Sequence, residues 1–88
     1  MRTCWKEQIE YAMMGVPGET WEDVVSKTIT EEELLVEFDD SYGSKEGIPF
    51  TLWTKNRVYF PCVYHGSEWV SSVSRNPDGI STLYIGNV

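Results

Sequence analysis

Two strand-like runs joined by a short turn constrain the fold of this chain more than any other feature. Arg57 to Tyr64 is rich in β-branched and aromatic residues, which favour strands. His65-Gly66 follows as a hairpin turn, and Ser67 to Val73 places its side chains alternately on two sides, as a strand does. Pro61 lies within the first run, and because proline has no amide hydrogen for a neighbouring strand, it predicts an edge position or a bulge.

Two more strands are expected beside this hairpin. Phe50 to Thr54 precedes it across the tight connection Lys55-Asn56. Ile80 to Ile85 follows it after Asn76-Pro77-Asp78-Gly79, which is a strong turn sequence. The second half of the chain therefore predicts a meander of three or four antiparallel strands.

The first half of the chain carries helix signals instead. Apolar residues at helical spacing predict a helix from Cys4 to Met14, and a shorter one is expected from Trp21 to Lys27. Thr30 and Glu33 form a capping-box pattern that starts a third helix, with Phe38 on its buried face. Because helices precede strands, the sequence predicts an α+β domain with two or three N-terminal helices packed on a three- to four-stranded antiparallel β-meander.

The length of 88 residues predicts one domain, 1–88, with a small core. Four Trp, five Tyr and three Phe supply much of that core, since each buried ring removes roughly 150–250 Å² from water. Cys4 and Cys62 are expected to be free thiols, with a disulfide between them as the alternative. No apolar run suits a membrane span or a signal peptide, so we expect a cytoplasmic protein without a membrane partner.

The charge is unevenly distributed along the chain. Residues 1–46 hold twelve acids and four bases, a net charge of −8, whereas residues 47–88 carry +1, and the whole chain carries −7. Nucleic acid is bound mainly through Lys and Arg on phosphates, so direct DNA or RNA binding is disfavoured. The same charge attracts a basic surface on another protein.

Catalytic chemistry finds little support in the sequence. Asp39 and Asp40 are the most enzyme-like residues, because adjacent carboxylates can bind a cation such as Mg²⁺, but no phosphate-binding loop accompanies them. His65 is the single histidine and is expected to be a turn residue, and Cys4, Cys62 and His65 are too scattered to predict a zinc site. The sequence therefore predicts no catalytic residue, no metal and no cofactor, with a metal-dependent enzyme using the two aspartates as a minority interpretation.

A binding surface is the better-supported hypothesis. A cluster of acids exceeds what helix capping needs, and we expect it to attract a basic partner, although a solvated face is the ordinary interpretation. Exposed aromatic residues would supply the anchoring area, since Trp and Tyr are enriched at interface hot spots. The predicted binding residues are Glu31, Glu32, Glu33, Glu37, Asp39, Asp40, Trp53, Tyr59 and Trp69.

Residues 38–77 contain a series of short motifs: Phe38-Asp39-Asp40, Tyr42-Gly43, Pro49-Phe50-Thr51, Trp53-Thr54, Arg57-Val58-Tyr59-Phe60-Pro61, Tyr64, Gly66, Glu68-Trp69-Val70 and Arg75-Asn76-Pro77. With these motifs the segment resembles one shared by small uncharacterised proteins of bacteriophages and prophages, and the resemblance carries no assigned activity. It implies a phage accessory protein. Proteins of this kind often bind and block host enzymes, including restriction and CRISPR machinery, so the resemblance implies an inhibitor or modulator of a host protein in the host cytoplasm, for example as a nucleic-acid mimic.

Two further hypotheses remain open from the sequence. In the first, a sheet face stacks a planar small molecule or nucleotide on aromatic rings while an arginine meets its phosphate. In the second, the edge strand beside Pro61 or the strand Ile80 to Ile85 pairs with a second copy, giving a homodimer. The residues of the ligand hypothesis are Trp53, Tyr59, Phe60, Trp69, Arg57 and Arg75.

Overall fold

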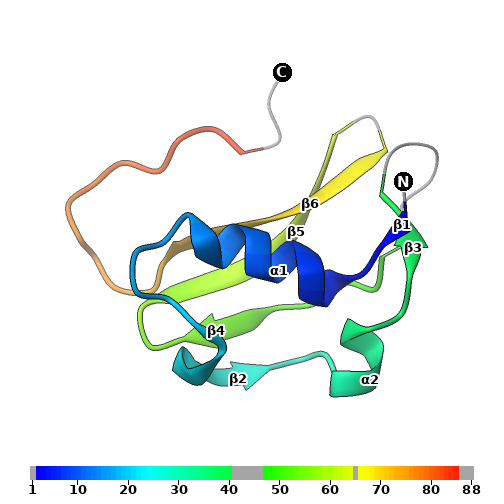
Figure 1. The fold of residues 1–88 in the computed structure, drawn as a ribbon. Coiled ribbons are helices and arrows are strands. Elements are labelled where there is room, and N and C mark those ends of the chain that lie inside the picture. The colour runs from blue at the N-terminus through cyan, green and yellow to red at the C-terminus, as the bar shows by residue number, and fades with distance from the viewer. Residues whose placement is uncertain (1, 41–46, 65, 86–88) are drawn as a thin grey trace.

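The main element of the fold is a four-stranded antiparallel sheet, with one helix of ordinary length, α1, crossing one of its faces (Figure 1). The computed structural model describes residues 2–40, 47–64 and 66–85. The strand order in the main sheet is β2-β4-β5-β6, and β1 and β3 form a separate two-stranded sheet. The strands span Arg2–Thr3 (β1), Val24–Lys27 (β2), Phe38–Asp39 (β3), Leu52–Thr54 (β4), Arg57–Tyr64 (β5) and Ser67–Ser74 (β6), and the helices span Trp5–Met14 (α1) and Glu31–Leu34 (α2).

The prediction of two or three N-terminal helices on a meander is wrong, because the described chain is mostly β. Residues expected as the second helix form a 3₁₀ turn, Trp21–Asp23, and then strand β2. Thr20 and Asp23 make a complete capping box for that turn. The β-branched Val24 and Val25 follow it and favour a strand, so the chain leaves the helical path and pairs with β4 instead.

The third expected helix also ends early. Thr30 and Glu33 form the predicted capping box, but α2 has only four residues. Phe38 is buried and pairs with Thr3 in the small sheet, and its ring lies 4.6 Å from that of Trp5. A longer α2 would remove Phe38 from this strand pair, so tertiary packing rather than the cap sets the length of the helix.

The predicted hairpin is confirmed. β5 and β6 pair without interruption from Arg57 opposite Ser74 to Tyr64 opposite Ser67. Gly66 has φ +82°, a conformation that favours glycine, and His65 lies outside the described residues.

Pro61 lies at a position of β5 where no neighbouring strand needs a hydrogen bond from its backbone nitrogen. The pairing of β5 with β4 ends at Tyr59, and Pro61 lies opposite Val70 on the other neighbour. The backbone amide of Glu68 donates to the Asp40 carbonyl and therefore points away from β5. Because backbone groups alternate in direction along a strand, those of Val70, Ser72 and Ser74 also point away from β5. The Pro61–Val70 pair is therefore one without ladder bonds, and the edge position predicted from Pro61 is confirmed.

The predicted final strand is wrong, because Ile80 to Ile85 forms no regular structure. The residues before it make a local turn, in which the Ile80 amide donates to Asp78 Oδ1 at 2.9 Å and Gly79 has φ +74°. The segment after the turn runs outside the sheet (Figure 1).

The core lies between α1 and one face of the main sheet. Trp5 is 1% exposed, its Nε1 donates to the Ile48 carbonyl at 2.8 Å, and its ring also meets that of Phe50. Both cysteines are free thiols, as predicted, and no helix in the described ranges is long and apolar enough to cross a membrane. The core cluster comprises Trp5, Ile9, Met13, Ile29, Leu34, Phe38, Phe50, Leu52, Tyr59 and Val70.

A buried hydroxyl network fixes the loop after α1 to the sheet. The Glu19 carboxylate accepts a hydrogen bond from Thr54 at 2.5 Å and one from the Tyr59 hydroxyl at 3.1 Å. Burial of the ring and then the nearby Glu19 charge raise the pKa of Tyr59 far above its ordinary value.

This pKa shift predicts a loss of stability in alkali. An unfolded tyrosine ionises near pH ~10, whereas folded Tyr59 keeps its proton there, so unfolding releases a proton and stability falls above that pH by up to about 1.4 kcal/mol per unit. Urea unfolding at pH 8 to 11 measures the effect. Tyr59→Phe should lower stability at pH 8 but flatten the alkaline fall, whereas Tyr11→Phe, at a side chain that is 71% exposed, should retain it. If the free energy of unfolding fell equally steeply with pH in both variants, the result would contradict this account.

Candidate interaction face

The two faces of the main sheet differ in how deeply their side chains are buried. Neighbouring residues of a strand point to opposite faces, and residues paired across strands share one. Leu52 pairs with Tyr59, and Pro61 with Val70, so Leu52, Tyr59 and Val70 lie on the face that packs in the core under α1. Trp53 pairs with Val58, and Cys62 with Trp69, and these residues lie on the other face.

This second face, which we call the aromatic face, is apolar and only partly buried. Its large side chains are partly exposed, and within the described residues none of them belongs to the core cluster. Its strands carry no charged side chain on this side, although charged residues make up 24% of the chain. It comprises Trp53, Val58, Phe60, Cys62, Tyr64, Trp69, Ser71 and Val73.

The structure separates the three predicted aromatic anchors. Trp53 and Trp69 both lie on the aromatic face and are partly exposed. Tyr59 is on the opposite face and is 0% exposed, so the expectation that it anchors a partner is corrected. The alternation of β5 explains the difference, because Tyr59 directly follows Val58 and must point the other way.

The residues expected to hold a planar ligand are likewise not brought together. Phe60 joins Trp53 and Trp69 on the aromatic face, whereas Arg57 lies on the face of Tyr59. Arg57 Nε donates to Ser72 Oγ at 2.7 Å and its Nη2 to the Ser72 carbonyl at 3.0 Å. Arg75 Nη1 donates to the Thr54 carbonyl at 2.8 Å. Both guanidinium groups therefore bond to atoms of the sheet itself and lie off the face that carries the three rings.

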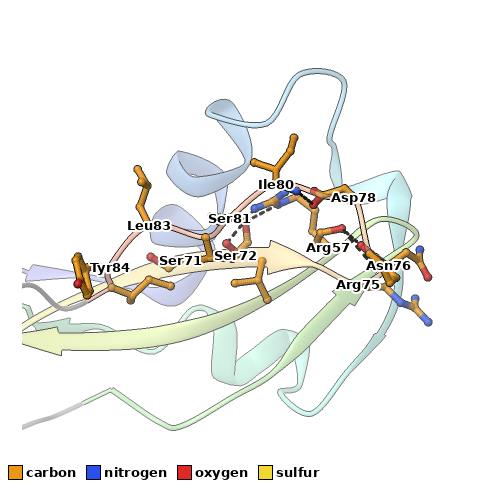
Figure 2. Close-up of a pocket in the computed structure, with 15 residues that line it drawn as sticks. Arg57, Ser71, Ser72, Arg75, Asn76, Asp78, Ile80, Ser81, Leu83 and Tyr84 are labelled. Carbon is orange, nitrogen blue, oxygen red and sulfur yellow. Dashed lines mark hydrogen bonds between the residues drawn. The ribbon is translucent and has the colours of Figure 1, made fainter.

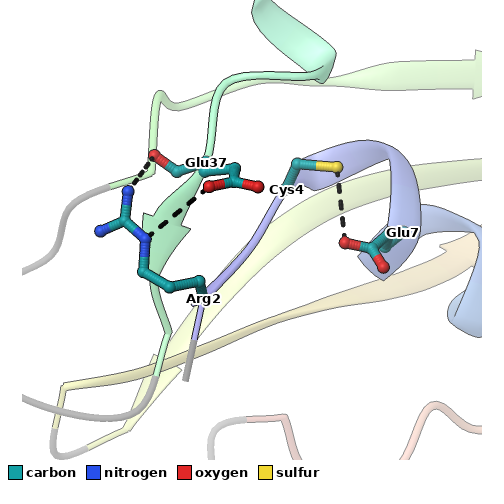
Figure 3. A network of polar contacts seen from close by, with 4 residues as sticks. All are labelled: Arg2, Cys4, Glu7 and Glu37. Carbon is teal, nitrogen blue, oxygen red and sulfur yellow. Dashed lines mark hydrogen bonds and ion pairs between the residues drawn. The ribbon is translucent and has the colours of Figure 1, made fainter.

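Several acids of the predicted cluster have structural partners. Lys27 Nζ lies 3.2 Å from Glu31, and Glu33 accepts from the Thr30 amide as a cap. Arg2 lies against Glu37, with Nε 4.0 Å from the carboxylate and Nη2 donating to the Glu37 carbonyl (Figure 3). The capping interpretation thus accounts for part of the cluster.

The remaining acids lie on α2 and at the end of β3. Asp40 accepts from Gln8 Nε2 at 3.0 Å, Asp39 lies in β3, and Glu32 is exposed on α2. Across the ranges that the structure describes, no three His, Cys, Asp or Glu side chains are grouped to hold a metal ion. None of the six acids lies on the aromatic face, so the predicted attraction and the predicted anchors belong to different parts of the molecule.

Sequence reasoning missed that Trp53, Phe60 and Trp69 share one face of the sheet. The available signal was that β5 is apolar on both sides: Tyr59 on one, and Val58, Phe60 and Cys62 on the other. A strand of that kind needs cover on both faces. Because α2 is short, the described chain supplies a helix of ordinary length for one face only, and no described helix packs on the other.

The comparisons with known proteins leave this geometry as the guide to function. The chain matches no protein-family model, and neither a search of curated proteins nor one of solved structures found a match.

Proposed function

We propose that the protein is a non-catalytic binding protein that inhibits or modulates a partner protein through its aromatic face. The observation that carries the proposal is an uncharged, partly exposed sheet face that contains Trp53, Phe60 and Trp69 outside the core. Apolar surfaces of this kind on small soluble proteins mark interaction sites. Charge depletion with aromatic enrichment is also the composition of an interface core.

The rigidity of this face supports the proposal. Val58, Phe60 and Cys62 are held by the continuous β5–β6 ladder, so their order is set before a partner arrives. Large rings held on a sheet lose little conformational freedom on binding, which leaves more of their contact energy for affinity. Trp53 and Trp69 are the two largest side chains on the face and therefore the expected anchors.

The charge of the chain defines the chemistry of the partner. A net charge of −7 attracts a protein whose contact patch is apolar and whose surroundings are basic. Acids such as Glu32 lie off the aromatic face, so their role in this proposal is long-range attraction, with packing on the rings providing the short-range contact. The resemblance of residues 38–77 to phage proteins favours a host protein as this partner.

Salt dependence of the association rate tests the partner chemistry. The partner is captured on the immobilised chain, purified, and its rates are measured in about 0.05 M and 0.5 M salt, where the Debye length falls from roughly 14 Å to about 4 Å. The on-rate should fall at least about fivefold, while the off-rate, set by ring packing, should change much less.

A matched pair of charge reversals localises the attraction. Glu32 and Glu22 are both exposed acids at the start of a short helix. Glu32→Lys should flatten the salt dependence more than Glu22→Lys, because Glu32 belongs to the acidic cluster. An on-rate that is equal at both salt concentrations would rule out the basic partner.

A further inference from the structure

The outer edge of β6 is open along part of its length. β6 is the last strand of the main sheet, so one of its edges has no neighbouring strand in that sheet. The backbone groups of Ser72 and Ser74 point toward this outer edge, in the same direction as the Glu68 amide that donates to Asp40. In the described chain no backbone acceptor meets the outward amides of Ser72 and Ser74. Arg57 covers one outward carbonyl, that of Ser72, and charged cover of this kind is how natural sheets protect an edge.

The chain also carries an exposed segment with the composition of a strand. Ile80 to Ile85, which we call the C-terminal segment, combines β-branched, aromatic and hydroxyl residues without a charge. Its apolar side chains face water: Ile80 is 76% exposed, Leu83 85% and Tyr84 98%. Nothing in the described chain covers them, although the segment has the sequence preference of a buried strand.

The open edge and the C-terminal segment face each other across a groove. The segment runs back along β6, and the two border a cavity of about 630 Å³ (Figure 2). Ser72, Ser74, Ser81 and Thr82 place hydroxyl groups around it, and Arg57 lies at its wall. The charged residues of the lining are Arg57, Arg75 and Asp78, a local charge of +1 in a chain of net −7.

We propose that a second copy of the chain fills this groove with its own C-terminal segment. Each segment would lie between the β6 edge and the C-terminal segment of the other copy, and two-fold symmetry makes the two insertions equivalent. The outward amides of Ser72 and Ser74 would gain carbonyl partners, as in other additions of a strand to a sheet edge. Ile80, Leu83 and Tyr84 would leave water in both copies at once.

The turn after β6 favours a second copy over closure of the segment onto its own edge. Ser74 Oγ donates to the Asn76 carbonyl at 2.6 Å and accepts from the Asn76 amide, and the Asp78 carboxylate accepts from the Ile80 amide. These bonds and Pro77 set a path that leaves the segment beside the edge but not paired with it. A second copy can enter the groove without breaking the hydrogen bonds of this turn. Its C-terminal segment carries no charge, so the charged residues of the groove do not repel it.

Light scattering on the full chain between about 10 µM and 1 mM tests the proposal. The wild type should form a dimer, and Leu83→Glu and Tyr84→Glu should each weaken it at least about tenfold, because a carboxylate would be buried among apolar groups. Tyr11→Glu makes the same change at a side chain that is 71% exposed on α1 and should leave the dimer intact. All three positions lie outside the core, so circular dichroism should show an unchanged fold.

Hydrogen exchange separates the possible arrangements. The amides of Ser72, Ser74 and residues 80–85 should become protected as the concentration of the wild type rises, and not in Tyr84→Glu. A monomer at every concentration overturns the proposal, and so does protection of residues 80–85 that is independent of concentration, which would mean closure onto the chain's own edge. A dimer that resists both glutamate variants but is lost in Trp69→Thr would assign the interface to the aromatic face and equally overturn it.

Discussion

Trp5→Ala is expected to remove a large part of the free energy of unfolding in water at 25 °C, and to unfold the chain if its total stability lies near the lower end of the usual range. The side chain is 1% exposed, contacts the rings of Phe38 and Phe50, and donates to the Ile48 carbonyl. Removal of a buried tryptophan costs about 3–5 kcal/mol, and a domain of this length has a total stability of roughly 4–13 kcal/mol. The loss of the ring therefore removes a large part of that total. Far-UV circular dichroism and urea titration measure the loss.

Two variants bracket this result. Trp5→Phe keeps an aromatic ring but loses the hydrogen bond to Ile48, so it should fold with a lower urea midpoint. Tyr11→Ala removes a ring from the exposed side of the same helix and should change the free energy of unfolding by less than about 0.5 kcal/mol. A cooperative transition of Trp5→Ala within 1 kcal/mol of wild type would show that the core does not centre on this residue.

Local chemistry was sufficient to predict the hairpin and the caps. β5 and β6 were readable because β-branched and aromatic runs flank a glycine turn, and each signal favours the same structure. The capping box predicted at Thr30 forms, and a second one forms at Thr20. A cap fixes where a helix begins, however, and says nothing about where it ends.

The errors arose where distant contacts decide local structure. Residues after Asp23 pair with β4, and Phe38 pairs with Thr3, and neither partner is visible within a helix-sized window of sequence. Ile80 to Ile85 shows the reverse case, since its residues favour a strand but the chain offers it no pairing in the described structure. Strand formation depends on a partner as well as on composition.

The sequence predicted the candidate site only in part, because burial also depends on contacts between distant residues. Trp53 and Trp69 are partly exposed and lie outside the core cluster, whereas the sequence alone left open which aromatic residues are exposed. Tyr59 could not be told from them by residue type. Its burial follows from strand alternation together with the register of β5 against β4, which requires the fold.

Replacement of both exposed anchors is expected to abolish binding and leave the fold intact. The double variant Trp53→Thr/Trp69→Thr removes the two largest rings of the aromatic face, whereas threonine keeps the strand preference of both positions. A tryptophan hot spot contributes about 2–4 kcal/mol, so the pair should weaken affinity by at least about a hundredfold. Because neither side chain belongs to the core, the free energy of unfolding should fall by no more than about 2 kcal/mol.

Calorimetric titration of the purified partner into this double variant tests the central claim most directly. The matched control is Tyr11→Thr/Leu35→Thr, which removes two large apolar side chains that are more exposed but lie off the aromatic face. The account predicts that the control binds within about threefold of wild type, while the Trp53→Thr/Trp69→Thr protein, shown to be folded by its urea transition, gives no measurable heat. Equal affinity of the folded double variant and the wild type would contradict the claim that the aromatic face is where this protein binds its partner.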